Sequence, residues 1–397
     1  MAEVFLTIFF ISVLLFFLGS GIWVALSMIG VSAIGMILFT SRPVGDAMAT
    51  TIWGTSSSWT LTALPLFVWM GEILFRTKLS ENLFKGLSPW MQKLPGGLIH
   101  VNVVGCALFA AISGSSAATV ATVGKMSIPA LRKRNYPETI LLGSLAGSGT
   151  LGLLIPPSII LIIYGVAVQE SIAKLFIAGI IPGIMIALIF MSYVIIWSLI
   201  NKKQMPKIKE EYSFLEKIQR SKQLLPVILL ISAVIGSIYT GIATATEAAS
   251  LGVVGALILS YFQKSLTLKT FKSSLLGATK TSCMIAFILA GSTFLSLAMG
   301  FTGLPRNLAI WIQNMDLSPY VLILVLMIFY IILGMFLDGI SAVVLTMAII
   351  EPMIRQAGFD MIWFGIFLVI VVEMAQITPP VGFNLFVLQG MANRDMG

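Results

Sequence analysis

Five runs of this sequence contain no charged residue and approach or reach the length of a helix that crosses a lipid bilayer. They cover residues 4–18, 22–40, 175–200, 224–240 and 320–337. A helix needs about 20 apolar residues to cross the hydrocarbon layer, and backbone groups in lipid must hydrogen-bond within the protein. The runs therefore predict an all-α, polytopic integral membrane protein.

The composition agrees with a lipid environment, because 58% of the 397 residues are hydrophobic and only 10% are charged. Soluble domains carry about 25% charged residues. The net charge of +8 is scattered through loops, which is typical of the Lys and Arg excess in cytoplasmic loops and argues against a nucleic-acid partner. One histidine and two isolated cysteines predict neither a metal cluster nor a disulfide framework.

The longest polar stretch, residues 201–223, divides the chain near its middle. Its basic residues are Lys202, Lys203, Lys207, Lys209, Lys217, Arg220 and Lys222. This excess predicts a cytoplasmic loop. Counting outward from it predicts spans at residues 172–200, 138–168, 224–242, 244–262 and 276–302. The next loop that this places in the cytoplasm is also basic, with Lys264, Lys269 and Lys272.

Two stretches have the pattern of a hairpin that enters and leaves the membrane on one side. Residues 96–131 have basic residues at both ends and the polar centre 113–116, and arms of about 15 residues reach only ~22 Å. We expect this hairpin to enter from the cytoplasm. Residues 318–355 have a similar pattern around the centre 337–341. Their flanks contain few basic residues, Arg306 and Arg355, and the flanking acids include Asp316. This predicts entry from the periplasm, the alternative being two ordinary helices kinked at glycine.

The hairpins belong to a weak internal repeat. An offset of 225 pairs Gly114 with Gly339, and an offset of 223 pairs the proline doublets 156–157 and 379–380. Proline has no backbone donor and clashes with the preceding turn, so each doublet should interrupt a helix. Inverted repeats that each contain a broken helix are typical of secondary transporters with a site at the membrane midplane.

The interrupted helices also indicate what could bind. Freed carbonyls can coordinate Na⁺, whereas helix N-termini favour anions. Asp338 is the clearest single candidate, because a carboxylate within a membrane helix is costly unless it faces water or a partner. Glu72, Glu247 and Glu373 are either functional acids or interhelical hydrogen-bond anchors. The serines at the breaks either bind ligands or only allow close helix packing.

These motifs resemble a known family. Four segments are similar to those of the large membrane subunit of tripartite ATP-independent periplasmic (TRAP) transporters. They are Ala111-Ile112-Ser113-Gly114-Ser115-Ser116-Ala117-Ala118-Thr119, Ile155-Pro156-Pro157-Ser158, Leu337-Asp338-Gly339 and Ile377-Thr378-Pro379-Pro380. The resemblance implies an elevator mechanism, sodium coupling and a bacterial inner-membrane location. It also implies a small four-helix membrane partner (the Q subunit), a periplasmic substrate-binding protein (the P subunit) and an organic-acid substrate.

The resemblance further assigns residues and domains. It implies one sodium site at Ser113, Ser116 and Gly149, and another at Gly334, Gly339 and Thr378. It places Ser115, Ser116, Ser158 and Asp338 near the substrate. The expected division is scaffold for residues 1–95 and 171–275, and transport domain for residues 96–170 and 276–397. Family members usually continue into a further C-terminal helix, whereas this sequence ends at Gly397. We therefore expect either that the sequence is incomplete or that a scaffold helix is absent.

The substrate and two other functional classes remain open at this stage. Residues 63–76 and 100–106 look most like the branch that transports sialic acid (N-acetylneuraminate), and a C4-dicarboxylate importer is the alternative. An intramembrane serine hydrolase would need His100 close to Ser113 or Ser115. A passive channel would show no accumulation against a gradient.

Overall fold

The computed structural model describes residues 2–77, 79–206, 212–222, 224–303, 307, 310, 318–379 and 382–392. Throughout these ranges the regular secondary structure is helical and no β-strand is assigned, as the apolar runs predict. Lys207, Lys209, Arg306, Asp316 and Pro380, which entered the topology argument, lie outside the described residues.

The N-terminal part contains two short apolar helices and a bent pair. Its elements are α1 (Ala2–Gly19), α2 (Val24–Phe39), α3 (Val44–Ser56), η1 (Trp59–Thr62), α4 (Ala63–Phe75) and α5 (Leu79–Met91). Phe10 of α1 lies so close to Gly35 of α2 that a Cβ at this glycine would lie 2.5 Å from its ring. The segments 44–56 and 59–75 bend by 53° relative to each other.

The next part contains the first predicted hairpin and the first predicted break. Its elements are α6 (Ile99–Ser113), α7 (Ser116–Arg132), α8 (Glu138–Gly149), η2 (Thr150–Leu153), α9 (Ile159–Ala167) and α10 (Ile172–Ile200). The predicted span 172–200 coincides with α10. The predicted span 138–168 is divided between α8 and α9, which agrees with an interruption at the proline doublet.

The middle of the chain joins the two repeats. Its elements are η3 (Lys202–Gln204), α11 (Phe214–Ser221), α12 (Leu225–Tyr239) and α13 (Ala245–Phe262). Ser213 and Thr244 begin α11 and α13 with capping boxes, in which Glu216 and Glu247 return hydrogen bonds to the backbone of the caps. Glu247 is thus the cap partner of an exposed helix terminus rather than an interhelical anchor.

The last part contains a long helix, the second hairpin and the second break. Its described elements are α14 (Leu268–Thr302), α16 (Pro319–Gly334), α17 (Gly339–Gln356), α18 (Met361–Gln376) and α19 (Phe383–Ala392). The predicted span 276–302 lies within α14, which begins earlier, because Thr267 caps the helix and residues 268–275 are already helical. Lys269 and Lys272 therefore lie on α14, and Lys264 remains in the loop.

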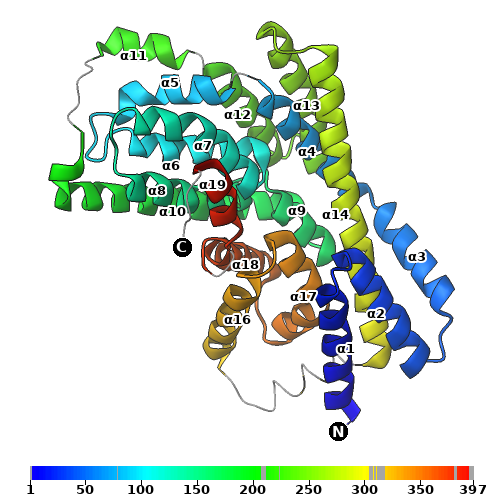
Figure 1. Cartoon of the computed structure of the whole chain (residues 1–397). Coiled ribbons are helices and arrows are strands. Elements are labelled where there is room, and N and C mark those ends of the chain that lie inside the picture. Colours follow the sequence, from blue (N-terminus) through cyan, green and yellow to red (C-terminus); the bar gives the residue numbers. More distant parts are fainter. Residues whose placement is uncertain are drawn as a thin grey trace.

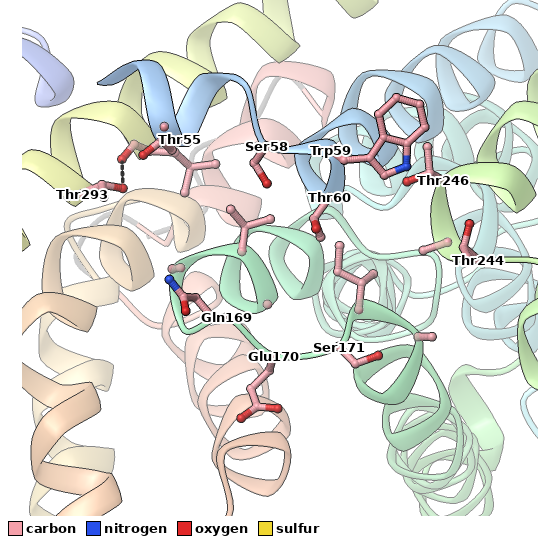
Figure 2. A pocket seen from close by; sticks show the side chains of 18 of the residues that line it. Thr55, Ser58, Trp59, Thr60, Gln169, Glu170, Ser171, Thr244, Thr246 and Thr293 are labelled. Carbon is pink, nitrogen blue, oxygen red and sulfur yellow. Dashed lines mark hydrogen bonds between the residues drawn. The ribbon is translucent and has the colours of Figure 1, made fainter. Parts of the chain in front are cut away.

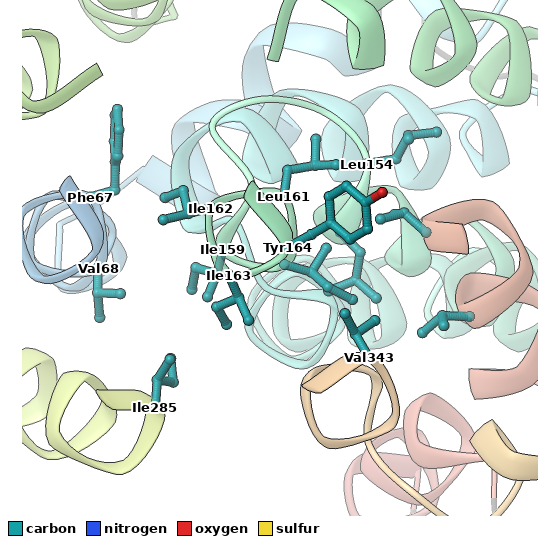
Figure 3. Packing of buried hydrophobic residues seen from close by; sticks show 14 of the residues in the cluster. Phe67, Val68, Leu154, Ile159, Leu161, Ile162, Ile163, Tyr164, Ile285 and Val343 are labelled. Carbon is teal, nitrogen blue, oxygen red and sulfur yellow. The ribbon is translucent and has the colours of Figure 1, made fainter. Parts of the chain in front are cut away.

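The short helix α9 lies between several of the longer helices. Figure 1 shows α14 running beside α2, α3 and α4, with α13 packed on α4, and with α6, α7, α8 and α10 together in another group. Every residue from Ile159 to Gly165 is buried, and Figure 3 shows the apolar side chains of α9 between Phe67 of α4, Ile285 of α14 and Val343 of α17. This packing places both hairpin regions next to the centre of the molecule.

Four described helices are individually long and apolar enough to cross a membrane. They are α10, α13, α14 and α17, and the number rises to six if each of two bent helix pairs forms one span. A 29-residue helix such as α10 is about 43 Å long, which exceeds the ~30 Å hydrocarbon core. Few of its side chains are buried within the chain, as expected of a lipid-facing or partner-facing helix.

Candidate functional site

The first hairpin turns at the predicted glycine. Gly114 ends α6 with a left-handed backbone, φ 59°, which favours glycine. A Cβ here would also lie 2.8 Å from the carbonyl oxygen of Pro157. Ser115 then caps α7 by accepting a hydrogen bond from the Ala118 amide. The helix–turn–helix is therefore present where the sequence predicts it, while its direction of entry into a membrane stays a prediction.

The first interrupted helix packs directly on this turn. The helix ends through η2, and Ser158 begins α9 as its N-cap. The amide of Ile159 donates to the carbonyl of Gly114 at 3.3 Å. The break and the hairpin turn thus satisfy part of each other's backbone, which stabilises two irregular segments inside the protein.

The second predicted hairpin has its turn at Met335–Leu337, immediately after α16, and its re-entrant path stays a prediction because α17 alone is long and apolar enough to cross a membrane. Asp338 is the N-cap of α17, and its Oδ2 accepts a hydrogen bond from the Ser341 amide at 3.1 Å. The predicted centre 337–341 extends too far, because Gly339, Ile340 and Ser341 already belong to α17. The carboxylate suits this place, since it accepts from an otherwise unpaired helix amide.

The second interrupted helix follows the same plan as the first. The helix α18 ends at Gln376, and the Thr378 hydroxyl donates to the Met374 carbonyl at 2.6 Å. The next helix, α19, begins at Phe383. The described residues therefore contain an interruption at the position that the second proline doublet predicts.

Gln376 joins the two repeats, and the sequence analysis missed it. The Ser116 hydroxyl donates to Gln376 Oε1 at 2.8 Å, linking the first hairpin to the second break. A Cβ on Gly339 would lie 2.7 Å from Gln376 Nε2, so the same side chain also lies against the second hairpin. Both Ser116 and Gln376 are buried. The only sequence signal was an amide side chain directly before the break.

The first predicted sodium site is only partly assembled around its three residues. The Ser113 hydroxyl lies 2.9 Å from Thr119 Oγ1 and 3.2 Å from the Ser115 carbonyl, and Thr119 donates to that carbonyl at 2.7 Å. These oxygens form a cluster of the type that hard cations prefer. Ser116 points to Gln376 instead, and Gly149 packs against the Val120 side chain. Thr119 was not predicted.

The second predicted sodium site gathers its residues at the end of α18. Gly334 packs closely against Ala375, since a Cβ on this glycine would lie 2.6 Å from the Ala375 Cβ. Gly339 lies against Gln376, as described above. Thr378 follows two residues later. Its hydroxyl donates its proton to the Met374 carbonyl, which leaves the lone pairs of the hydroxyl oxygen available to a cation.

A cavity of about 1270 Å³ lies beside both hairpin turns. Residues 113–118 and 338–341 contribute to its wall, together with parts of α2, α4 and α14. Gln376 reaches it too. This single cavity brings Ser113, Ser115 and Ser116 of the first turn together with Asp338 and Gly339 of the second. The two turns are separated by more than 200 residues in the sequence.

Ser158 and two of the acids differ from the other candidates. Ser158 is fully buried and donates to the Leu153 carbonyl while capping α9, so it is not part of the described cavity wall in this conformation. Glu72 is on that wall but pairs with Arg76 at 2.7 Å. Glu373 lies on α18, and its side chain is buried within the protein.

A second pocket of about 810 Å³ lies at the C-terminal end of α9. Its wall is rich in hydroxyl groups, and Figure 2 shows Thr55, Thr60 and Thr293 among them. We call it the threonine-lined pocket. It reaches α9 at Gly165, whereas the cavity reaches α9 at Ile159. Along α9 these two positions are about 9 Å apart, with buried side chains such as Ile162 and Ile163 between them, whereas on α14 the two hollows are lined by the consecutive residues Ile288 and Leu289.

The hydrolase alternative is not compatible with the geometry. His100 and Ser113 lie near opposite ends of α6, about 20 Å apart along the helix. The His100 Nε2 is engaged with the Pro95 carbonyl at 2.8 Å. A nucleophile and its base must come within ~3 Å, so these residues cannot form a catalytic pair.

Two helix–turn–helix units, two helix breaks and a shared cavity in a helical membrane chain are typical of the architecture of secondary transporters. The fold is similar to that of the Alcanivorax borkumensis YdaH transporter, with a TM-score of 0.64 and 12% sequence identity, over 94% of this chain and 90% of that chain. The chain belongs to the family described as "Tripartite ATP-independent periplasmic transporter, DctM component", which matches residues 9–397.

Two relatives place the chain among the large permease subunits. It is 34% identical over 370 residues to the C4-dicarboxylate TRAP transporter large permease protein DctM of Pseudomonas aeruginosa, covering 93% of this chain and 86% of that protein. It is 31% identical over 372 residues to the sialic acid TRAP transporter large permease protein SiaM of Vibrio cholerae, covering 93% and 86%. The motif resemblance is thus confirmed, and the chain is a transporter subunit rather than an enzyme.

The link between Ser116 and Gln376 leads to a first prediction. Ser116→Ala and Gln376→Leu each remove one side of a buried hydrogen bond, which costs about 1–3 kcal/mol. We expect each variant to lower organic-acid uptake roughly tenfold, and the double variant to be little worse than either, because partners in contact are not additive. Uptake in vesicles, normalised to the folded protein in the membrane, measures this. Fully multiplicative losses would mean that the two residues act independently.

Proposed function

We propose that this large permease subunit imports an organic acid by a sodium-coupled elevator mechanism. The observation that carries the proposal is the single cavity that both hairpin turns reach, with Gln376 between them. A substrate in this cavity would contact both repeats at once. Moving the hairpins with their helix breaks as one body would then carry the substrate and its ions together.

The oxygen groups at the two breaks support sodium as the coupling ion. The Ser113, Ser115 and Thr119 oxygens lie within hydrogen-bond distance of one another, and the second break leaves carbonyl groups near Thr378. Both places are irregular backbone inside a membrane protein, the setting in which secondary transporters bind Na⁺. In this proposal Ser113, Ser116 and Gly149 belong to one site, and Gly334, Gly339 and Thr378 to the other.

The arrangement of the helices supports a division into moving and static parts. We assign residues 96–170 and 276–397 to the transport domain and residues 1–95 and 171–275 to the scaffold. The apolar contact of α9 with Phe67 and Val68 of α4 in Figure 3 would be part of the sliding surface. Apolar side chains without hydrogen bonds across the surface suit such a motion, because sliding breaks no polar contact.

The substrate is proposed to be a carboxylate. The motif resemblance favours sialic acid, and a C4-dicarboxylate is the second candidate, supported by the name of the Pseudomonas aeruginosa relative. Asp338 and the serines at the first turn would contact the polar groups of either solute. The proposed partners are the small four-helix membrane subunit and the periplasmic substrate-binding protein, in the bacterial inner membrane.

Reconstitution with both proposed partners tests the function. With an inward sodium gradient, proteoliposomes are expected to accumulate radiolabelled N-acetylneuraminate above the external concentration, and succinate to a lesser extent. Preference for succinate would favour the dicarboxylate alternative. Equilibration without accumulation would indicate a passive channel and contradict coupled transport.

A further inference from the structure

Lys280 brings a positive charge to the cavity wall from α14. It lies roughly 18 Å along this helix from Leu268, and it shares the wall with the hairpin turns. Among the described residues of that wall it is the only basic one. Its side chain is exposed, on the same part of the wall as Met284 and Ile288.

The other charges at the cavity already have partners. Glu72 forms an ion pair with Arg76 at 2.7 Å, and the same guanidinium donates to the Ser273 carbonyl at 3.1 Å. Asp338 accepts from the Ser341 amide. Within the described part of the chain, the Lys280 ammonium makes no salt bridge and no hydrogen bond. It is therefore the charge at this cavity that is available to a ligand.

The surroundings of Lys280 strengthen its attraction for an anion. The neighbouring wall is mostly apolar, with Phe75, Cys283, Met284 and Phe287 close in the sequence or on the facing helix. A charge pair in such a place interacts more strongly than in bulk water. An ammonium within a membrane-spanning helix also requires water or a counter-charge. Both arguments indicate an anionic ligand.

We propose that Lys280 pairs with the carboxylate of the transported acid in this cavity and makes the transporter select anionic over neutral solutes. The inference rests on the proposed function, since it concerns the recognition of the same substrate. Lys280 supplies the charge, while the hairpin turns supply the hydrogen-bonding groups.

The first test separates binding from turnover. In the reconstituted complex, Lys280→Gln is expected to raise the KM for the transported acid about tenfold or more, with a smaller change in Vmax, because a hydrogen-bonded charge pair is lost. Lys280→Arg keeps the charge and is expected to retain most of the affinity. Lys272→Gln is the matched control, since Lys272 lies on the same helix away from the described cavity wall. An unchanged KM for Lys280→Gln would overturn the proposal.

The second test does not depend on transport. Cys283 is exposed and lies on the cavity wall one turn from Lys280, whereas Cys106 is buried. The measured quantity is the ratio of two rates of Cys283 modification, by a negatively charged and by a positively charged thiosulfonate reagent. This reagent ratio should be higher in the parent protein than in Lys280→Gln. Lys280→Arg should keep the parent ratio, and Cys283→Ala gives the background.

The two tests also separate this inference from the proposed function. Parent protein that accumulates no organic acid would contradict the function, yet the reagent ratio would still report the charge of Lys280 at the cavity. Normal accumulation by the parent protein, together with an equal reagent ratio in Lys280→Gln, would overturn the role of Lys280 alone.

Discussion

Asp338→Ala is expected to lower uptake by about a hundredfold, which corresponds to ~2.7 kcal/mol. The substitution removes a carboxylate from the cavity beside both hairpin turns and also removes the N-cap of α17. The cap itself is worth about 1 kcal/mol, so loss of stability explains only part of the effect. Initial uptake rates and thermal unfolding of the purified variant measure the two contributions.

Two variants separate the carboxylate from the cap. Asp338→Asn keeps an oxygen that accepts from the Ser341 amide, so it should remain as stable as the parent and still lose most uptake if the charge matters. Asp360 caps α18 in the same way, accepting from the Trp363 amide at 2.8 Å, and it is not on the described cavity wall. Asp360→Ala should therefore cost similar stability and leave uptake within about twofold. Normal uptake by Asp338→Ala would make this residue a structural acid.

Replacing sodium with potassium is expected to reduce accumulation to the level of empty liposomes. A tenfold sodium gradient supplies ~1.4 kcal/mol per ion, and one net charge moving through 100 mV supplies ~2.3 kcal/mol. Two sodium ions with one monoanion would thus provide about 5 kcal/mol, enough for a several-thousandfold concentration ratio. The two oxygen-rich breaks suggest at least two ions.

The membrane potential provides the control for this stoichiometry. Import of two sodium ions with a monoanion is electrogenic, so a negative interior potential should increase accumulation at a fixed sodium gradient. One sodium with a monoanion would be electrically silent and would reach only about tenfold. Uptake that continues in potassium would contradict sodium coupling, and uptake of a monoanion that ignores an imposed potential would contradict its import with two or more sodium ions.

The sequence predicted those parts of the site that depend on local chemistry. Gly114 and the doublet 156–157 mark the first turn and the first break because glycine and proline limit the backbone directly. Asp338 was identified because a charge is unusual in an apolar run. The same residue also precedes a helix, and its capping role follows from that local position.

The sequence could not predict contacts between distant segments. Gln376 meets Ser116 across 260 positions, and neither residue type signals such a partner. Lys280 was overlooked because one lysine in a long apolar helix gives no indication of which wall it faces. Lys269 and Lys272 were assigned to a loop because basic residues are typical of loops, whereas the Thr267 cap starts α14 before them.

Ser158 illustrates a signal with two meanings. A serine before an apolar run is typical of both a helix N-cap and a ligand-binding residue at a break. The structure uses its hydroxyl within the α9 cap, and its approach to the substrate stays a prediction. Only the positions of the neighbouring carbonyl and amide groups distinguish the two roles.

The short segment of α9 between the cavity and the threonine-lined pocket has an electrical consequence. If the two hollows open to opposite faces of the membrane and fill with water, the transmembrane voltage falls mainly across the apolar side chains that separate them. Along α9 that distance is about 9 Å rather than the ~30 Å of the whole hydrocarbon layer, so the field along this helix would be about threefold stronger. A bound charge would experience most of the voltage by passing Ile162 and Ile163, and a small displacement of the hairpins would suffice to make import sensitive to the membrane potential.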